Sequence, residues 1–518
     1  MDGSLGPVDD PGRTESAVTG VLPATLRVAV VLYNFSDHRD APMGPAEVRD
    51  LVFSGTGSAP ATASVNSYFR EITETRMSIT GDVFGWHTLA RSARAADGRL
   101  DVVECGLLAD IEAAAAGSGF SRNNYDVVIY ATSFAILGSY KGGKIIFAEA
   151  MSRQRSLGIF AHEIGHFLGL SHANTYTCGG PGNYVSIDQS AACSPNEYGD
   201  GTSLMGGGSP TFHPSSFEKL AIGAWSPAQV RDIRAQSTGV YWLPALERGG
   251  VPGSRALRIP LRRTPYAGLA AYYYLDYRQA LGFDSPLATT PFVGGVSIHL
   301  GADYAWKNDS PDCGGNFRYS ASPLLIDATP ETGGLFNDAP LTLGRTFRDA
   351  TEGLSVRVIS MNRLGALVDV GCGERRLTAA RPGIQGTTPG MVMDGDATSG
   401  FKTGHDGWQY VQIDAGCEIE VRRIRRHMTP GANPPFPGRA LQGEQISYSL
   451  DGRNYTFLAT NRTSGWQRYV AYDGRAWHSV GYDWSAWLDL NTPVRARYIR
   501  YHWDGNGPDE ALNEIELD

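Results

Sequence analysis

The chain has 518 residues, 42% of them hydrophobic and 19% charged, and its formal net charge is −9. This length predicts about three domains, with enough apolar residues for several buried cores. The acidic balance excludes a broad basic surface for nucleic acid, and no apolar run approaches the ~18–20 residues of a membrane-spanning helix. The 63 glycines and 29 prolines indicate many turns and a β-rich body.

Residues 1–15 are polar and lack the charged-then-apolar build of a signal peptide, and we expect residues 1–24 to form a flexible segment. Export would then depend on another signal or on a leader trimmed from this sequence. Residues 25–235 alternate between apolar runs and helical spacing, which predicts a mixed, twisted α/β sheet. The predicted strands are 26–35, 77–86, 125–131 and 144–148, and the predicted helices are 61–75 and 101–116.

The stretch from His162 to His172 carries the clearest chemical signal, because it matches H-E-x-x-H-x-x-G-x-x-H. His162 and His166 are four residues apart, so they share one helix face and can bind one metal ion. Gly169 lets the helix end in a turn that brings His172 back as a third ligand. Three histidines leave one tetrahedral position open, which is typical of a catalytic zinc, and Glu163 is the predicted general base.

A short H-E-x-x-H pattern alone can also be a solvated helix face. Here residues 156–161 are mostly small and apolar, so the helix should be buried and its polar side chains need a partner. The extended motif resembles the metzincin clan of zinc peptidases, in which a methionine turn lies below the metal. Met205, in the glycine-rich stretch 200–207, is the candidate for that turn; core filling is the alternative.

The resemblance can be narrowed to the gametolysin family of metallopeptidases over about residues 25–226. The segments that carry it are 34–37, 64–69, 79–83, 198–225 and the zinc motif. It implies an exported zinc endopeptidase that cleaves extracellular or cell-wall proteins. It also implies that an edge strand beside the cleft pairs with the substrate backbone, and residues 143–149 are the candidate. The candidate substrate-binding residues are Gly143, Lys144, Ile145, Ile146 and Phe147.

One position departs from a pattern found in some metzincins, which place a tyrosine ligand two residues after the turn methionine. Gly207 occupies that position here, so no fifth protein ligand is expected. Tyr198 and His213 flank the turn and could reach the cleft, but we expect structural roles for both.

Six cysteines are present, and none has a zinc-like C-x-x-C spacing. Cys178 and Cys193 bracket a loop rich in glycine and asparagine, so we predict a disulfide between them. Cys313 with Cys372 is a second candidate pair, and Cys105 is expected to be a buried thiol inside a helix. This balance favours an oxidising, extracellular compartment.

Residues 236–373 consist mostly of segments with the alternating or apolar pattern of β-strands, which predicts a middle β-sandwich packed on the peptidase domain. A tyrosine-rich row at 272–277 could be a ligand platform, but packing is the expected role of tyrosine in strands. The predicted strands are 271–278, 295–300, 324–327, 354–359 and 366–370.

Residues 374–518 begin with a linker rich in Gly, Pro and Thr and then alternate as strands. They resemble the discoidin, galactose-binding-like jelly roll found in coagulation-factor C domains and many carbohydrate-binding modules. The resemblance implies a glycan-binding β-sandwich with a calcium ion, for which hard oxygen donors are suited. The candidate calcium ligands are Asp394, Asp396, Thr398 and Glu514, with a simple Asx turn at residues 394–396 as the alternative. Trp466, Trp477, Trp484 and Trp487 are expected near loops, where they could stack on sugars or fill the core.

Two functions follow from these observations. The first is a secreted zinc endopeptidase that the C-terminal module directs to glycans or glycoproteins, including mucin-like substrates. The second is an inactive adhesion or glycan-binding protein on a peptidase scaffold. The second is disfavoured because Glu163 and all three histidines are present, whereas loss of activity usually removes one of them.

Overall fold

The computed structural model describes residues 21–517 with internal gaps, so most of the expected flexible segment 1–24 lies outside it. The segments left out after residue 20 are 60, 137, 180–184, 188–192, 208–210, 234–238, 262–268, 303–304, 309–312, 314–316, 333–335, 350–351, 372–375, 395–398, 403–406, 430–444, 461–469, 473–476, 480–482, 485–486, 506–510 and 518. No helix of the described part is both long and apolar enough to span a membrane.

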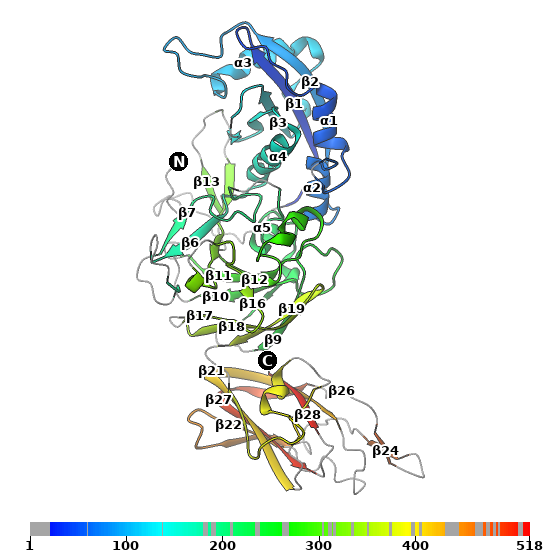
Figure 1. Ribbon diagram of the computed structural model, residues 1–518, viewed down its shortest axis with the longest axis vertical. Coiled ribbons are helices and arrows are strands. Elements are labelled where there is room, and N and C mark those ends of the chain that lie inside the picture. The colour runs from blue at the N-terminus through cyan, green and yellow to red at the C-terminus, as the bar shows by residue number, and fades with distance from the viewer. Residues whose placement is uncertain are drawn as a thin grey trace. The chain divides into compact units, whose positions relative to one another are not determined.

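The chain divides into two compact units, each described here by itself. The first contains Met1–Asp232 and Pro244–Pro340, and the second contains Ile233–Leu243 and Leu341–Asp518. Strands arranged in several separate sheets dominate both units (Figure 1). The expected division into 25–235, 236–373 and 374–518 stays a prediction.

A five-stranded sheet forms one part of the first unit, and its order is β2-β1-β3-β5-β4. The strands are β1 (Thr25–Phe35), β2 (Ser78–Leu89), β3 (Val127–Thr132), β4 (Ser139–Tyr140) and β5 (Ile145–Glu149). All neighbours are parallel except β4, which runs antiparallel to β5. The four strands predicted between residues 26 and 148 are therefore confirmed.

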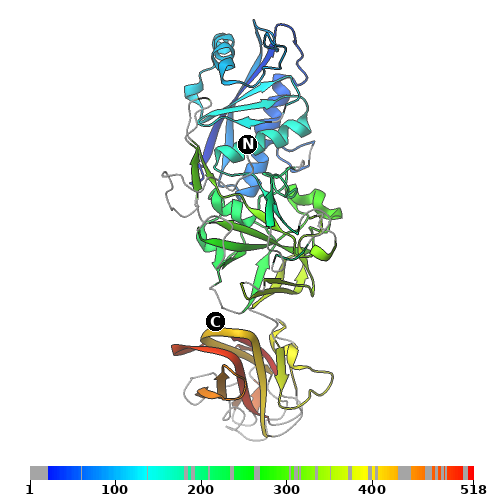
Figure 2. The ribbon, with the colours of Figure 1, turned by 90° about the vertical axis from the view of Figure 1, so that its left-hand side faces the viewer.

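The helices of this unit cover both faces of that sheet because β1 is apolar on both of its faces. Val28 and Val30 pack with Phe160 and Ile164 in one core, whereas Val31 packs on the other face. Figure 2 shows the helices alongside the sheet. They are α1 (Pro45–Arg49), the π-helix η1 (Asp50–Ser54), α2 (Val65–Ile72), α3 (Leu108–Ala115) and α4 (Arg153–Phe167). The helix α5 (Ser216–Ala221) of the same unit instead packs on β11 (Ala271–Tyr277).

Short 3-10 turns connect these elements. They are η2 (Cys105–Leu107), η3 (Ala116–Ser118), η4 (Arg122–Asn124), η5 (Pro227–Gln229), η6 (Gly282–Thr289), η7 (Pro330–Thr332) and η8 (Pro389–Met393). The helix predicted over 101–116 is therefore shorter than expected, since it begins as η2 and continues as α3.

The edge of the five-stranded sheet differs from the expectation that residues 143–149 form it. Ile146 and Phe147 in β5 pair with β3 on one side and with β4 on the other. β4 is therefore the edge strand, because the hairpin that precedes β5 folds back and covers its free side.

A second sheet of the first unit has the order β7-β6-β15-β12-β11-β10-β8. Strands from both sides of the expected boundary at residue 235 take part in it. They are β6 (Asn174–Cys178), β7 (Cys193–Asn196), β8 (Val230–Asp232), β10 (Ala256–Pro260), β11 (Ala271–Tyr277), β12 (Gly295–Ala302) and β15 (Leu324–Ile326). A separate hairpin contains β13 (Ala305–Asn308) and β14 (Phe317–Ser320).

The second unit contains a four-stranded sheet of order β17-β18-β19-β9 and a seven-stranded sheet built around β21 and β27. The first sheet has β9 (Gly239–Pro244), β17 (Thr346–Asp349), β18 (Leu354–Asn362) and β19 (Gly365–Gly371); the two-residue strand β16 (Leu341–Thr342) precedes β17. The second has β20 (Arg376–Ala379), β21 (Gly407–Thr429), β22 (Gln445–Ser449), β23 (Thr456–Thr460), β26 (Asp483–Trp484), β27 (Leu488–Gly505) and β28 (Ala511–Leu517). A hairpin joins β24 (Val470–Tyr472) and β25 (Trp477–Ser479).

The described residues contain two disulfides, and one of them corrects an expectation. Cys178 and Cys193 are joined as predicted, and they lie directly opposite each other on β6 and β7. Cys105 is not a buried thiol within a helix: it lies in the η2 turn and pairs with Cys313, 208 residues away. This pairing replaces the expected Cys313–Cys372 bond; Cys372 lies outside the described residues.

A buried ionic network links the second sheet to the segment after the histidine motif. Arg278 follows β11, is fully buried and pairs with the buried Asp284 at 3.0 Å. Its guanidinium also donates to the carbonyl oxygens of Thr202 and His213 at 3.0 and 2.9 Å. Arg278 therefore fixes two loop segments of one unit to each other.

Replacing Arg278 by methionine should lower the free energy of unfolding by about 3–5 kcal/mol, because it leaves the buried carboxylate of Asp284 without its cation. Denaturant unfolding monitored by tryptophan fluorescence measures the loss. The control is Arg49→Met, which breaks a solvent-exposed pair with Asp82 and should cost about 1 kcal/mol or less. Equal effects of the two substitutions would contradict the central role of Arg278.

Candidate metal centre

The turn after α4 places the third histidine as the sequence predicts. α4 ends at Phe167, and Gly169 follows with a φ of 100°, a left-handed conformation that favours glycine. The amides of Gly169 and Leu170 donate back to the last turn of the helix, to His166 O and Gly165 O. The chain therefore reverses directly after the helix.

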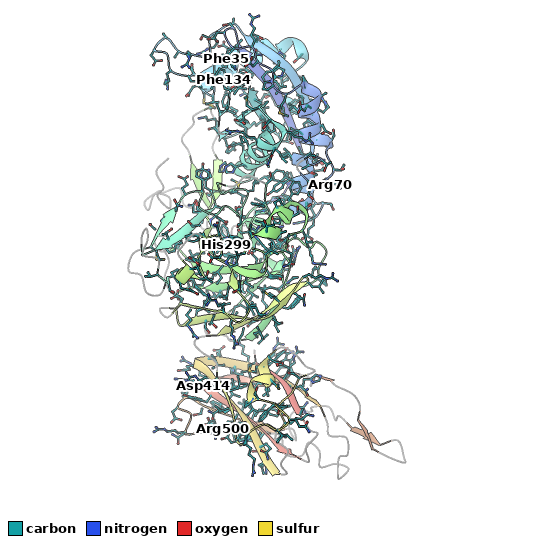
Figure 3. All side chains as sticks on the ribbon, viewed as in Figure 1. Phe35, Arg70, Phe134, His299, Asp414 and Arg500 are labelled. Carbon is teal, nitrogen blue, oxygen red and sulfur yellow. A yellow bond between two sulfur atoms is a disulfide. The ribbon has the colours of Figure 1, made fainter. Side chains whose placement is uncertain are left out.

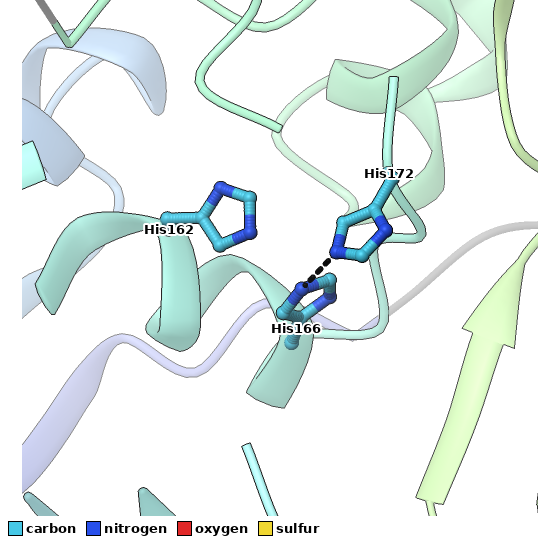
Figure 4. Close-up of side chains that lie close together, drawn as sticks. All are labelled: His162, His166 and His172. Carbon is cyan, nitrogen blue, oxygen red and sulfur yellow. Dashed lines mark hydrogen bonds between the residues drawn. The ribbon is translucent and has the colours of Figure 1, made fainter. Parts of the chain in front are cut away.

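The three histidines of the motif converge on one point (Figure 4). One ring nitrogen from each of His162, His166 and His172 lies within 4.8 Å of the others. The Nε2 atoms of His166 and His172 are 3.1 Å apart. Two ligands on one tetrahedral zinc are separated by about 3.3 Å, given Zn–N bonds of ~2.0–2.1 Å, so this spacing suits such an ion.

The opposite ring nitrogen of each histidine has its own acceptor. The Nδ1 atoms of His162 and His166 lie 2.9 and 2.7 Å from the carbonyl oxygens of Leu204 and Leu170. The Nδ1 atom of His172 lies 2.7 Å from Glu197 Oε1. Protons on Nδ1 would satisfy these acceptors and leave each Nε2 with a lone pair, which is the form that binds a metal.

Burial favours the neutral form of all three rings. It lowers the pKa of His162 to about 4, and it also lowers the pKa values of His166 and His172. At neutral pH three lone pairs would therefore face one another, an arrangement that a cation relieves. The donor set of three neutral imidazoles fits zinc.

Glu163 lies beside this centre and is almost fully buried. Burial raises its pKa to about 8, a shift that the backbone amide of Tyr140 and the charge of Lys141 oppose. Its Oε2 atom accepts no hydrogen bond from the described residues. Gly138 packs so closely against the carboxylate that a side chain at that position would overlap it. The residues before and in β4 thus hold Glu163 in place.

Met205, the candidate for the turn methionine, packs against the helix that carries His162 and His166. Its side chain is fully buried, and a Cβ atom at Gly165, between His162 and His166, would lie 2.5 Å from its sulfur. Its carbonyl oxygen accepts from the amide of Ala173, so the turn also contacts the segment that carries His172.

Buried side chains from the second sheet and α5 hold this turn. His299 Nε2 on β12, labelled in Figure 3, lies 3.0 Å from Asp200 Oδ2, and both residues are fully buried. Asp200 Oδ1 accepts from the amide and hydroxyl of Thr202, and Glu218 accepts from the Ser203 hydroxyl. Because Leu204 O faces His162, these contacts position one of the histidines.

Glu197 and Tyr198 both contact His172. Tyr198 was expected to have a structural role although it could reach the cleft, and no role was predicted for Glu197. The Tyr198 ring lies 3.9 Å from the His172 ring, measured between centroids, and its φ of 61° is left-handed. Burial, helped by the charges of Glu197 and Glu163, raises the pKa of Tyr198 to about 12. The rule that a ligating histidine donates to a carboxylate could have pointed to Glu197. His213 instead lies buried beside Glu71, 2.8 Å away.

The candidate calcium ligands are only partly described. Asp394, at the end of η8, accepts from the Ser399 hydroxyl at 2.8 Å, and Glu514 is buried in β28. Asp396 and Thr398 lie outside the described residues, so the calcium site stays a prediction.

Trp466 and the side chains of Trp477 and Trp484 also lie outside the described part. Trp487 is described, and Arg423 and Arg425 stack on its ring.

Replacing Glu197 by alanine should weaken zinc binding by about 10–100-fold, because His172 loses the acceptor that orients its ring. Competition with a chromogenic chelator gives the affinity without any assay of turnover. Glu104→Ala, a change at an exposed glutamate of the same unit, should leave zinc affinity unaltered. Equal zinc affinity in wild type and Glu197→Ala would show that the contact has no role in holding a metal.

Carbohydrate-binding modules are among the solved structures to which part of the chain is similar. No protein-family model and no curated protein matches the chain. A Clostridium perfringens carbohydrate-binding module in complex with GalNAc-β-1,3-galactose matches with 13% identity and a TM-score of 0.20, covering 28% of this chain and 94% of its own. Chitosan-binding module 1 of a Paenibacillus sp. IK-5 chitosanase/glucanase matches with 20% identity and a TM-score of 0.21, and the match covers 28% of this chain and 96% of that module. The family 32 module of C. perfringens NanJ in complex with galactose matches with 14% identity and a TM-score of 0.20, and the match covers 28% of this chain and 92% of that module.

Proposed function

We propose that the chain is a zinc-dependent endopeptidase with a metzincin-type catalytic region. The observation that carries this proposal is the convergence of the His162, His166 and His172 nitrogens, with the buried Glu163 next to His162 on α4. A structural zinc site uses four protein ligands, whereas the described residues supply three here, and Glu163 follows the first of them in the chain. Three ligands with an adjacent base are typical of hydrolytic sites.

The three histidines and Glu163 would have different roles in peptide hydrolysis. The three imidazoles would hold a zinc ion, which would supply Lewis acidity to a water molecule and to the carbonyl oxygen of the substrate. Glu163 takes the proton from the attacking water through its free oxygen, and it then gives this proton to the leaving amine. A cation nearby favours the ionised carboxylate that the first step requires, against the burial that raises the pKa of Glu163.

The edge strand β4 supports a position for the substrate backbone. Its Tyr140 amide contacts the Glu163 carboxylate, so a chain paired along this edge would run directly past the general base. Such pairing satisfies main-chain donors and acceptors whatever the side chains of the substrate are. We therefore place the substrate along β4, whereas Ile145, Ile146 and Phe147 support that strand from inside the sheet.

A glycan-directing role for residues 374–518 completes the proposal. Their resemblance to galactose-binding-like modules supports binding of sugars on glycoprotein or cell-surface substrates. The two disulfides, Cys105–Cys313 and Cys178–Cys193, are compatible with an extracellular enzyme. An inactive adhesion protein would share these features, so the distinction depends on turnover.

Replacing Glu163 by glutamine should lower the rate of protein cleavage by about 10²–10⁴-fold, because the general base is lost. Zinc content should stay at one ion per chain, since the three histidines are unchanged. Peptide-bond hydrolysis followed by mass spectrometry, with metal analysis of the same sample, measures both. A wild-type chain that holds zinc and cleaves no protein would instead favour the adhesion protein.

Gly138→Ala should displace the Glu163 carboxylate and lower kcat by up to about 10²-fold, with zinc still bound. The matched control is Gly117→Ala, because a Cβ there meets no atom within 4 Å. Steady-state kinetics separates a fall in kcat from a rise in KM. Unaltered kcat in Gly138→Ala would mean that the contact with Glu163 is not required for positioning.

A further inference from the structure

The seven-stranded sheet of the second unit carries an aromatic surface around Arg500. In the antiparallel pair of β21 and β27, Gln412 lies opposite Arg500 and Tyr410 lies opposite His502. The intervening residues Val411, Ile413 and Tyr501 are buried in the core. Because strand side chains alternate between faces, the first set points away from that core. The Arg500 surface comprises Trp408, Tyr410, Gln412, Tyr455, Phe457 and Arg500.

The Nε atom of Arg500 is hydrogen-bonded, whereas its two terminal guanidinium nitrogens have no acceptor among the described residues. Its Cζ atom lies 3.7 Å from the Tyr455 ring centroid and 4.6 Å from that of Tyr410. Its Nε donates to Gln412 Oε1 at 2.9 Å, and the Tyr455 hydroxyl donates to the same oxygen at 2.6 Å. Neither terminal guanidinium nitrogen donates a hydrogen bond to a described residue. A guanidinium fixed in this way is a preformed two-donor site for a carboxylate.

The nearby carboxylates of the described chain are already engaged. Both Asp414 oxygens accept from Arg497, at 2.9 and 3.3 Å, and Figure 3 labels Asp414 and Arg500. Asp451 accepts hydrogen bonds within its own turn, from the amides of Arg453 and Asn454. The positive charge of Arg500 is therefore left for an anion from outside the described residues.

Large aromatic rings lie on the same face and are open to solvent. Trp408 and Phe457 are 53% and 55% exposed. Phe457 is aligned with Ser447, which is itself paired with Arg500, so its ring belongs to the same row across the sheet. The apolar faces of sugar rings stack on such aromatic side chains, whereas a free inorganic anion has no apolar face that could stack on them.

We propose that the Arg500 surface binds carboxylated saccharides, with the sugar ring on the aromatic side chains and the carboxylate on the Arg500 guanidinium. Uronic and sialic acids share this chemistry. The proposal deepens the glycan-directing role of residues 374–518, since it names the charge class of the sugar and places the contact on the sheet face. It does not depend on peptidase activity.

Calorimetric titration of the full chain tests the proposal with two acidic probes and their neutral counterparts. The probes are a trigalacturonide and 3′-sialyllactose, and the counterparts are the methyl-esterified trigalacturonide and lactose. At least one acid should bind, about tenfold or more tightly than its neutral form, and the stronger arm identifies the acid. Arg500→Ala should weaken that binding by about 10–100-fold, and Arg500→Lys should weaken it less, because it keeps the charge and loses the two-donor geometry.

Matched variants make the result decisive. Trp408→Ala should weaken binding of the acidic sugar, whereas Arg497→Ala, which removes an arginine already paired with Asp414, should leave it unaltered. Circular dichroism melting of each variant separates lost binding from lost folding. Binding of neutral sugars that Arg500→Ala does not alter would overturn the Arg500 proposal alone. No binding of any sugar by wild type would overturn it together with the glycan-directing role, and peptidase activity would be unaffected.

Discussion

The candidate metal centre depends on the acceptors that orient its three imidazoles. A histidine side chain on a helix can rotate, and which of its two ring nitrogens binds a metal is set by the hydrogen bond that the other nitrogen makes. Here two carbonyl oxygens and the Glu197 carboxylate engage Nδ1, which leaves Nε2 of each ring directed at one point. Each acceptor lies on a different segment, so the centre forms only where those segments meet.

The second sheet of the first unit belongs to this support rather than to a separable accessory domain. Leu204, which orients His162, lies in a turn that Asp200 and Ser203 fix to His299 and Glu218. Arg278 adds a buried cation to the same turn. Buried charges of this kind are costly unless every partner is present, so the sheet and the metal centre are expected to fold together.

The two proposed functions of the chain use different kinds of site, the metal centre and the Arg500 surface. The centre at the end of α4 is partly buried, and its chemistry depends on neutral imidazoles and a carboxylate with a raised pKa. The Arg500 surface is open, and its specificity depends on one charge among exposed rings. In the proposed enzyme the first would hydrolyse the substrate backbone, and the second would restrict which molecules reach it.

The sequence by itself determined the elements and residues whose signal is local. Strand periodicity gave β1, β2, β3 and β5, and the eleven-residue motif gave the helix, the left-handed turn at Gly169 and the three converging histidines. The Cys178–Cys193 disulfide was predictable because a 15-residue separation closes one loop. Only the tertiary structure decided the rest, because it depends on contacts between distant segments. Cys105 pairs with a cysteine 208 residues away, β4 covers the strand expected at the edge, and Glu197 meets His172 through a loop whose course no local pattern encodes.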